Sequence, residues 1–328
     1  MPELQLLRQI TTMKIVGYSC MLLVALAMYA CSTGGAAEEF DNKNQKPSPT
    51  SVDNTHKVPL SVYASMTRAE DNQWVAYDSI GIVLYDVNTN ILSDGRTNYH
   101  YFTDPSQLGS FTPISVDETA YYPQNGGNVD ILAYYPFNPN VGDDLLIPMC
   151  TSDQSNIPAI DYMVADKLLD RNADNPSVTL DFRHKMAKII VKLSKDTTNA
   201  AIVDLTTAKI TYKGGPMRAV WSMAMQDFYS KEAPEDLVLP YDPQTLTASA
   251  LVIPSSPGDT LLFRIEAKGW EGQVNPYEAR LAADDILAPG TVNNINIKID
   301  QTRVKVSVHV TDWNTKEIIS GNGEADYE

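Results

Sequence analysis

Two consecutive strands are predicted by a stretch in the middle of the chain, Val178-Thr179-Leu180-Asp181-Phe182-Arg183-His184-Lys185-Met186-Ala187-Lys188-Ile189-Ile190-Val191-Lys192-Leu193. Apolar residues alternate with polar ones in its first half, and alternate again in its second half on the opposite parity. A period of two is typical of strands that bury one face. Because a strand cannot reverse its buried parity without an extra residue, we expect a β-bulge near Met186–Lys188.

The same alternation recurs along most of the chain and indicates an all-β protein. Further short apolar runs, bounded by Asp, Asn, Gly or Pro, are found at 58–66, 80–85, 99–102, 129–135, 161–165, 295–299 and 304–310. After the N-terminal apolar segment, no stretch shows a sustained helical period. The spacing of strands and turns favours antiparallel β-sandwiches with about seven strands in each half.

We expect two domains, with the boundary in the polar segment 170–176. The N-terminal β-sandwich domain then covers residues 57–176 and the C-terminal β-sandwich domain residues 177–328. The first expected strand, 58–66, contains Pro59, which cannot donate to a ladder, so this strand is predicted to lie at an edge.

The N-terminus has the features of a lipoprotein signal. Lys14 precedes the apolar run 15–30, which ends at Ala30 and is followed directly by Cys31. Residues 1–30 are therefore predicted to be a signal peptide, and the Cys31 thiol to carry the lipid. An ordinary signal peptide with an incidental cysteine is the alternative. Met13 is a better start than Met1, because residues 1–12 add nothing that a signal needs.

Residues 31–56 are predicted to form a lipidated, flexible linker, because they are rich in Gly, Ala, Ser, Pro, Asn and Lys. Glu38-Glu39 close to the lipidated cysteine either resembles an acidic signal for the outside of the outer membrane or belongs to an ordinary solvated linker.

Charge and cysteine content narrow the classes of partner. The net charge is −16, and it becomes −17 once residues 1–30, with Arg8, Lys14 and Glu3, are removed. Such acidity argues against nucleic acid and anionic membrane surfaces as partners. Of the three cysteines, only Cys150 remains once Cys20 has left with the signal and Cys31 is lipidated, so no intrachain disulfide is expected.

The sequence offers no constellation typical of an enzyme. The four histidines form no zinc-binding pattern, and no nucleotide-binding or GxSxG motif is present. We therefore expect no catalytic residue, no metal and no cofactor. His184 shares parity with Phe182 and is interpreted as a hydrogen-bonded core histidine, and Cys150 as a lone structural thiol. The aromatic clusters 99–102, 121–122 and 134–137 fit core packing better than a glycan-binding platform.

An ordered set of motifs resembles the fimbrillin family, the lipoprotein pilins of type V pili in Gram-negative anaerobes. The motifs are Met66-Thr67-Arg68-Ala69, Trp74, Asp78-Ser79-Ile80-Gly81-Ile82, Val129–Phe137, Asp161–Ala165, Val178–Ile189, Ala288-Pro289-Gly290-Thr291 and Val310-Thr311-Asp312-Trp313. The resemblance extends from Cys31 to Trp313. One departure is Ala76-Tyr77-Asp78, where many relatives have a glycine before the aspartate.

The resemblance implies two transthyretin-like sandwich domains and a processing step. An arginine-specific surface protease would cut near the first strand, and a strand of the next subunit would fill the groove left behind. Arg68 and Ala69 flank the expected bond, because only a cut in this polar turn frees the whole first strand; Arg96 and Arg171 are the other loop arginines. The removable strand presents five inward residues, Val58, Leu60, Val62, Ala64 and Met66.

Two segments are candidate donors, the strand with Val304, Val306, Val308 and Val310 and the tail after Trp313; the former can also be a permanent strand of the second domain. The sequence thus predicts a structural pilus subunit, not an enzyme, that serves adhesion at the outer membrane and in the fimbrium. Its partners would be other pilus subunits, the protease and, through the lipid, the outer membrane. The alternative is an anchored surface lipoprotein that binds glycans; no host receptor is indicated.

Overall fold

The described part of the chain is almost entirely β-structure, as predicted. The structure is a computed structural model that describes residues 57–66, 73–87, 91–195, 203–269, 272–282, 285–299, 304–313 and 323–326. These residues belong to one compact unit, Asp53–Glu328. Its short helical segments are η2 (Ser93–Gly95), η3 (Val116–Glu118) and α2 (Ile157–Ile160).

Seven strands of the first half close into a ring. Their order is β2-β3-β4-β1-β9-β7-β5, and β5 returns to pair with β2, while β8 adds to β5. Their bounds are β1 (Ser61–Met66), β2 (Ser79–Asp86), β3 (Tyr99–Thr103), β4 (Ser110–Pro113), β5 (Val129–Tyr135), β7 (Met163–Ala165), β8 (Leu168–Arg171) and β9 (Ser177–His184). Their buried side chains, among them Val62, Ile82, Tyr101 and Phe182, form one core.

The second half contains two sheets that share another core. A six-stranded sheet has the order β15-β16-β10-β19-β20-β21, and a four-stranded sheet has the order β14-β11-β17-β18. Their bounds are β10 (Ala187–Lys195), β11 (Asp204–Pro216), β14 (Pro234–Val238), β15 (Tyr241–Asp242), β16 (Thr247–Val252), β17 (Leu262–Lys268), β18 (Val274–Arg280), β19 (Thr291–Ile299), β20 (Val304–Asp312) and β21 (Gly323–Asp326). Side chains of both sheets, such as Ile189, Ile210, Phe263 and Ile295, form this core, as expected for a β-sandwich.

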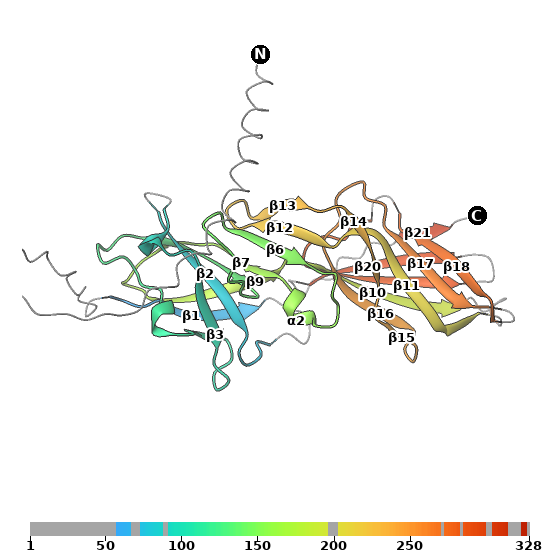
Figure 1. Cartoon of the computed structure of the whole chain (residues 1–328), viewed down its shortest axis with the longest axis horizontal. Helices are drawn as coiled ribbons and strands as arrows, with labels where there is room; N and C mark the ends of the chain where they lie inside the picture. The colour runs from blue at the N-terminus through green and yellow to red at the C-terminus, as the bar shows by residue number, and fades with distance from the viewer. Residues whose placement is uncertain are drawn as a thin grey trace, which may run out of the picture. The chain divides into compact units, whose positions relative to one another are not determined.

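A third, small sheet joins the two halves. β6 (Leu146–Cys150), from the first half of the sequence, pairs with β12 (Arg218–Ser222), which in turn pairs with β13 (Asp227–Lys231). Figure 1 shows these strands between the group that contains β1–β3 and the group that contains β16–β20. A third core beneath them draws on both halves, including Leu132, Trp221 and Trp313.

Three details differ from the expectations drawn from the sequence. The parity reversal after Phe182 is not a bulge, because β9 ends at His184 and β10 begins at Ala187 in a different sheet. The first sheet also extends past the boundary expected at 176/177, since β9 pairs with β1 and β7. Each strand has one buried face, and the chain changes core between them. The sheets are mixed, because β1–β9 and β10–β19 are parallel pairs.

Candidate functional site

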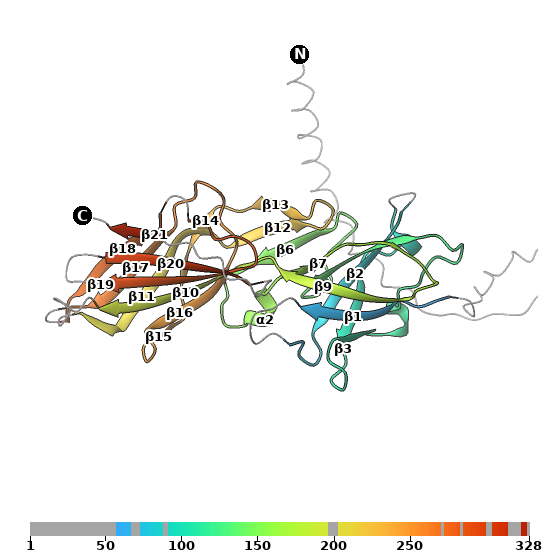
Figure 2. The same ribbon diagram turned by 180° about the vertical axis from the view of Figure 1, so that it is seen from behind.

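The candidate removable strand, β1, is one of the strands that form the ring, and it has a paired strand on each side. It pairs in parallel with β9 from Ser61↔Ser177 to Met66↔Phe182, and antiparallel with β4 at Val62↔Phe111 and Tyr63↔Ser110. Figure 2 shows β1 beside β9. The edge placement predicted from Pro59 is therefore wrong: Pro59 lies before the strand and forms only an isolated bridge with Tyr121. Removal of β1 would leave a slot bounded by two strands.

The inward side chains of residues 58–66, the segment that contains β1, belong to the first core, as the alternation predicted. Leu60, Val62 and Ala64 are buried, and the half-buried Val58 and Met66 pack against the same cluster. Full burial of Leu60 and Val62 alone contributes about 3–6 kcal/mol. An empty slot would expose this apolar surface, and its reburial would favour the binding of another strand.

The N-terminal end of β1 is held by the segment 118–122. Leu60 N–H donates to the Ala120 carbonyl at 2.9 Å, and Tyr122 N–H donates to the Val58 carbonyl at 3.0 Å. Ala120 is itself fixed, because its N–H donates to the buried Tyr101 hydroxyl at 3.0 Å. Burial raises the pKa of Tyr101 to about 12, so its phenol stays neutral at physiological pH.

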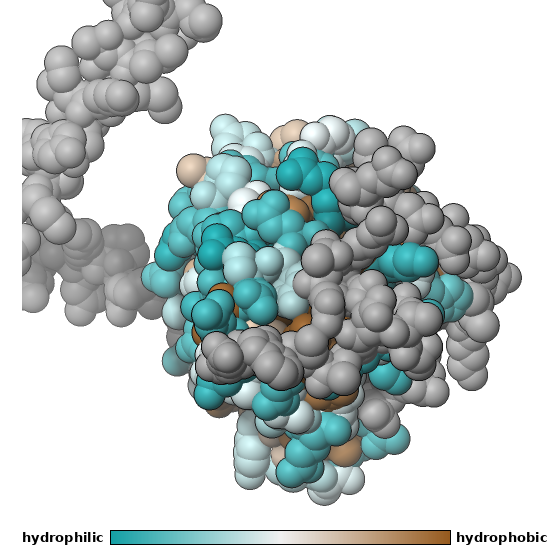
Figure 3. Space-filling model, turned by 90° about the vertical axis from the view of Figure 1, so that its right-hand side faces the viewer, coloured by the Kyte–Doolittle hydropathy of each residue, from teal (hydrophilic) through white to brown (hydrophobic). Residues whose placement is uncertain are grey.

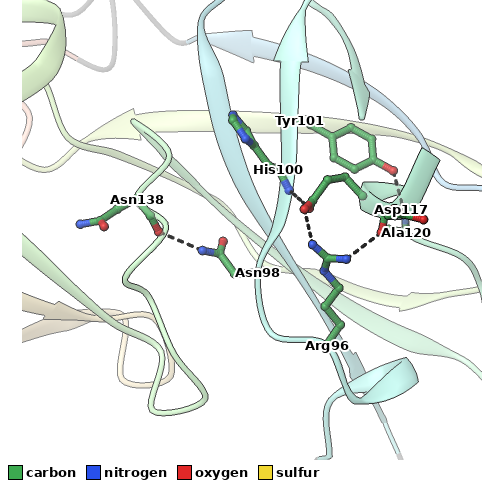
Figure 4. Close-up of polar contacts among 8 residues, drawn as sticks. Arg96, Asn98, His100, Tyr101, Asp117, Ala120 and Asn138 are labelled. Carbon is green, nitrogen blue, oxygen red and sulfur yellow. Dashed lines mark hydrogen bonds and ion pairs between the residues drawn. The ribbon is translucent and has the colours of Figure 1, made fainter. Parts of the chain in front are cut away.

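A polar cluster anchors this segment to the N-terminal end of β3 (Figure 4). Arg96 donates to the Asp117 carbonyl at 2.7 Å and forms an ion pair with Glu118. The other carboxylate oxygen of Glu118 accepts a hydrogen bond from the main-chain N–H of His100 at 2.9 Å. The His100 ring stacks on Phe137 at 3.8 Å between centroids, and burial lowers the pKa of its imidazole. These contacts hold in place the segment 118–122, which pairs with residues 58–60. A cut within 67–72 would leave this segment with the larger part of the chain.

The C-terminal end of β1 is held by Trp74 and Gly109. The Ala64 carbonyl accepts a hydrogen bond from the Trp74 indole N–H at 3.0 Å, and the Ala64 N–H donates to the Gly109 carbonyl at 2.8 Å. Trp74 is buried and packs edge-on against Phe111, Tyr135 and Phe182, with ring centroids 4.9, 5.5 and 5.3 Å apart. Trp74 lies after the expected cut in the sequence, so it also would remain with the acceptor.

The expected cleavage site itself, Arg68 and Ala69, lies outside the described residues, as does Cys31. The other two arginines considered are placed. Arg96 is held by Asp117 and Glu118, and Arg171 is the last residue of β8, where it is paired with Val129 of β5. Both are therefore constrained by local structure in the intact fold.

The two candidate donors have different positions. β20 pairs with β19 over nine residues, from Thr291↔Asp312 to Ile299↔Val304, and buries Val304, Val306 and Val308 in the second core, with Val310 packed against it. The tail after Trp313 contributes β21, which pairs with β20 along Lys305–Val308. β20 is thus an integral strand of the second half, and the tail is added at its outer side.

Trp313 marks the point at which the tail begins. Its ring is buried and stacks on His184, with centroids 3.7 Å apart, and the main-chain N–H of Trp313 donates to the Gly290 carbonyl at 2.6 Å. His184 Nδ1 lies 2.6 Å from the buried Asp161 carboxylate. His184 is therefore the hydrogen-bonded core histidine that the sequence predicted, and it joins the end of β9 to the base of the tail.

The remaining candidate residues are placed by the structure as follows. Within the described residues, no group of His, Cys, Asp or Glu is arranged to hold a metal ion. Cys150 is a free thiol at the end of β6, with its sulfur 3.0 Å from the Ser152 hydroxyl. Tyr99, Tyr101, Tyr122, Tyr134 and Tyr135 are buried, so these aromatic residues serve the core. No helix of the described segments is long and apolar enough to span a membrane.

The surface at the end of the second half gives no sign of a broad apolar face. In Figure 3 the visible described residues there are mostly hydrophilic, and apolar ones are scattered among them. The apolar side chains of residues 58–66, in contrast, belong to the first core.

The described residues form an all-β protein with three packed cores. The comparison with known proteins identifies the family. The fimbrillin-like family model matches residues 67–313, and the chain belongs to this family.

Two relatives are similar over most of their length. A protein of Bacteroides uniformis, described as a candidate fimbrium subunit, Fim1C, is 26% identical over 308 residues, which covers 92% of this chain and 96% of the relative. The crystal structure of a candidate cell adhesion protein from Bacteroides uniformis has a TM-score of 0.65 at 26% identity, and the match covers 79% of this chain and 99% of that one.

Sequence reasoning missed the contacts at both ends of β1. Trp74 was noticed as a family motif, without a role, and Gly109 and the cluster around Glu118 were not noticed. Gly109 has φ +88°, a conformation that favours glycine, and an added Cβ would lie 3.3 Å from the Ala64 carbonyl oxygen. The sequence carries a weak signal, the turn-forming stretch Asp104-Pro105-Ser106-Gln107-Leu108-Gly109, but it does not show which strand the glycine faces.

Proposed function

We propose that this protein is a structural subunit of a type V pilus and not an enzyme. Its family and the relative described as a fimbrium subunit support a fimbrial or adhesive role at the cell surface. In this proposal the chain is exported as a lipoprotein on Cys31, reaches the outer membrane and is cut after Arg68. The next subunit then supplies a strand in place of β1, and the assembled pilus serves adhesion.

One observation carries the proposal: β1 is the first described strand, and it fills a slot between β4 and β9. Only the segment 67–72 lies between β1 and the next described residue, Gln73. A single cut in that segment would leave β1 attached to the rest of the molecule by non-covalent contacts alone. A strand paired on both sides would leave two sets of unpaired main-chain groups, which favour addition of another strand.

The positions of the other arginines favour Arg68 as the processed residue. Proteases need an extended, accessible backbone, and such backbone is commonest in exposed loops. Arg96 is held by its ion pair with Glu118, and Arg171 is part of a paired strand. Arg68 lies in the polar sequence Thr67-Arg68-Ala69-Glu70-Asp71-Asn72.

The tail after Trp313 is the better candidate donor. β20 contributes three buried valines and a nine-residue pairing to its own subunit, so its departure would open the second core. The tail lies outside that core pairing, and Trp313 fixes the point from which it would extend. The partners in this proposal are other pilus subunits, an arginine-specific surface protease and, through the lipid, the outer membrane; the net charge of −16 argues against nucleic acid.

The test compares three variants in cells that assemble surface polymers. The wild-type protein should give a heat-labile ladder on gels of unboiled surface material, and Arg68→Ala should remove it. N-terminal sequencing of the wild-type polymer should begin at Ala69. Arg171→Ala is the matched control and should leave the ladder unchanged. A ladder of wild-type intensity from Arg68→Ala would contradict cleavage-gated assembly and would favour the anchored, glycan-binding lipoprotein.

A further inference from the structure

The two backbone groups of Ala64 are recognised by residues that are not part of the neighbouring ladder. β4 begins at Ser110, so at Ala64 the antiparallel partner has already ended. Gly109 and Trp74 take over on that side: the Gly109 carbonyl accepts from Ala64 N–H at 2.8 Å, and the Trp74 indole N–H donates to Ala64 O at 3.0 Å. Both residues follow the segment 67–72 in the chain and stay with the acceptor if β1 leaves.

The geometry around this pair is rigid. Trp74 is only 5% exposed, and three aromatic rings fix its orientation. Gly109 has φ +88°, and its N–H lies 3.3 Å from the hydroxyl of the fully buried Thr103. A donor and an acceptor held in this way are pre-organised for one strand position, so they bind a backbone without the cost of first ordering themselves.

The same position carries the smallest inward side chain of residues 58–66. Ala64 points into the core that contains Trp74, Phe111 and Phe182, whereas the other inward positions of β1 carry Val58, Leu60, Val62 and Met66. A larger side chain at this point would overpack the aromatic cluster, since cores are close-packed.

We propose that Trp74 and Gly109 form a register clamp, which selects a small residue at the Ala64 position in any strand that occupies the β1 slot. The proposal deepens the strand-replacement function proposed above and rests on it. The occupant is an extended segment of a second copy of this chain. The clamp binds the backbone of this segment at one position, and that position excludes registers that would place a large side chain there.

The clamp distinguishes the two candidate donors. In an extended strand, residues 319, 321, 323, 325 and 327 share one face. These are Ile319, Gly321, Gly323, Ala325 and Tyr327, so the tail offers Ala325 at the fourth position, where β1 has Ala64. β20 offers Val304, Val306, Val308 and Val310, with no small residue. Because glycine-rich strands have weakly specified register, this tail needs recognition through its backbone.

The experiment measures binding of strands to the opened slot. A site for a sequence-specific protease replaces residues 67–72, so that the measurement does not depend on Arg68. After cleavage, a fluorescent peptide of residues 57–66 is exchanged for the resident strand and followed by anisotropy. Peptides with Ala64→Val, with Tyr63→Val as the exposed matched control, and with the Ala64–Ser65 amide replaced by an ester compete for the slot, as does the peptide 314–328.

The clamp predicts a specific pattern. Ala64→Val should weaken binding by about tenfold or more, and Tyr63→Val by less than about threefold. The ester weakens the Ala64 carbonyl as an acceptor, so it should cost affinity on the wild-type acceptor and clearly less on Trp74→Phe, which keeps an aromatic ring but lacks the N–H. Trp74→Phe should weaken the unmodified peptide by about two- to tenfold. In peptide 314–328, Ala325→Val should reproduce the effect of Ala64→Val.

Each contrary outcome has one meaning. If the ester lowers affinity equally for the wild-type protein and for Trp74→Phe, the indole N–H does not recognise the Ala64 carbonyl. If Ala64→Val and Tyr63→Val have equal effects, the position does not select for size. Strand exchange itself would stand in both cases. The expected pattern without polymerisation of the cut subunit would support the clamp and refute the proposed function. Failure of the opened chain to exchange any peptide would refute both.

Discussion

Tyr101 serves the core with its ring and the candidate site with its hydroxyl, which accepts the Ala120 N–H. The free phenol ionises near pH 10, whereas burial raises the pKa of Tyr101 to about 12. Between these values the unfolded chain binds fewer protons than the folded chain, so stability falls as pH rises, by about 1.4 kcal/mol per pH unit for one group. The contribution is fully present below pH 10.

Tyr101→Phe should therefore flatten the dependence of unfolding free energy on pH by about one proton between pH 10 and 12. Urea unfolding at several pH values measures this slope. Tyr134→Phe is a positive control, because burial raises the pKa of Tyr134 to about 12 as well. An unchanged slope in Tyr101→Phe would show that Tyr101 is not buried as a neutral phenol.

The buried pair of His184 and Asp161 should matter more than the exposed pair beside it. Asp161→Ala leaves His184 Nδ1 without the carboxylate 2.6 Å away, and we expect a loss of about 1–3 kcal/mol in unfolding free energy. The control is Asp166→Ala, which removes the exposed partner of Arg183 and should cost less than about 1 kcal/mol. Equal losses in thermal or urea unfolding would argue against a structural role for the buried pair.

At the scale of the element, the alternation in the sequence predicted which side chains are buried but not which strands are neighbours. Leu60, Val62 and Ala64 face the core as expected, because side-chain parity is a local property. The position of β1 between β4 and β9 depends on segments more than a hundred residues away in the case of β9, and Pro59 suggested an edge. Similarly, the parity reversal after Phe182 was visible, but the change of sheet that causes it was not.

The candidate site could be predicted only in part, for the same reason. The candidate removable strand was predicted from its pattern and the family resemblance. Its contacts through Trp74, Gly109 and Ala120 join loop residues to a strand, and such contacts leave no periodic signal in the sequence.

The two candidate donors should differ in what they contribute to the fold. Deletion of residues 304–328 removes β20 with its buried valines and should abolish cooperative unfolding of the second half. Deletion of residues 314–328 removes only the tail and should shift Tm by a few degrees at most. Circular dichroism melts of both truncations measure the difference. If deletion of residues 314–328 alone abolishes the cooperative transition, the tail is an integral strand of its own subunit, which would count against it as the donor.

At the scale of the whole molecule, the all-β architecture followed from composition and periodicity, but the joint between the halves did not. β6 leaves the first half to pair with β12, and a third core containing Trp221 and Trp313 lies at this joint. The sequence indicated two independent sandwiches, because each apolar run was read by itself. Pairing between distant runs is decided by the packing of the complete chain.

Export is the remaining property of the whole molecule that a single residue tests. Cys31→Ala should abolish labelling by a palmitate analogue, since the thiol that would carry the lipid is gone. Cys150→Ala is the matched control and should retain the label, because Cys150 lies at the end of β6 in the folded domain. Labelling that persists in Cys31→Ala would refute the lipoprotein proposal.

The double-sided pairing of β1 has a mechanical consequence for an anchored subunit. A pulling force applied at Lys57 reaches β1 at its N-terminal end and acts along the strand. The hydrogen bonds to β4 and β9 are then loaded in shear, so they share the force and do not break one at a time. We expect such a joint to withstand greater force than a strand peeled from a sheet edge. Pulling single molecules from residue 57 and from residue 313 would measure it, and a rupture force as low as that of an edge hairpin would disprove it.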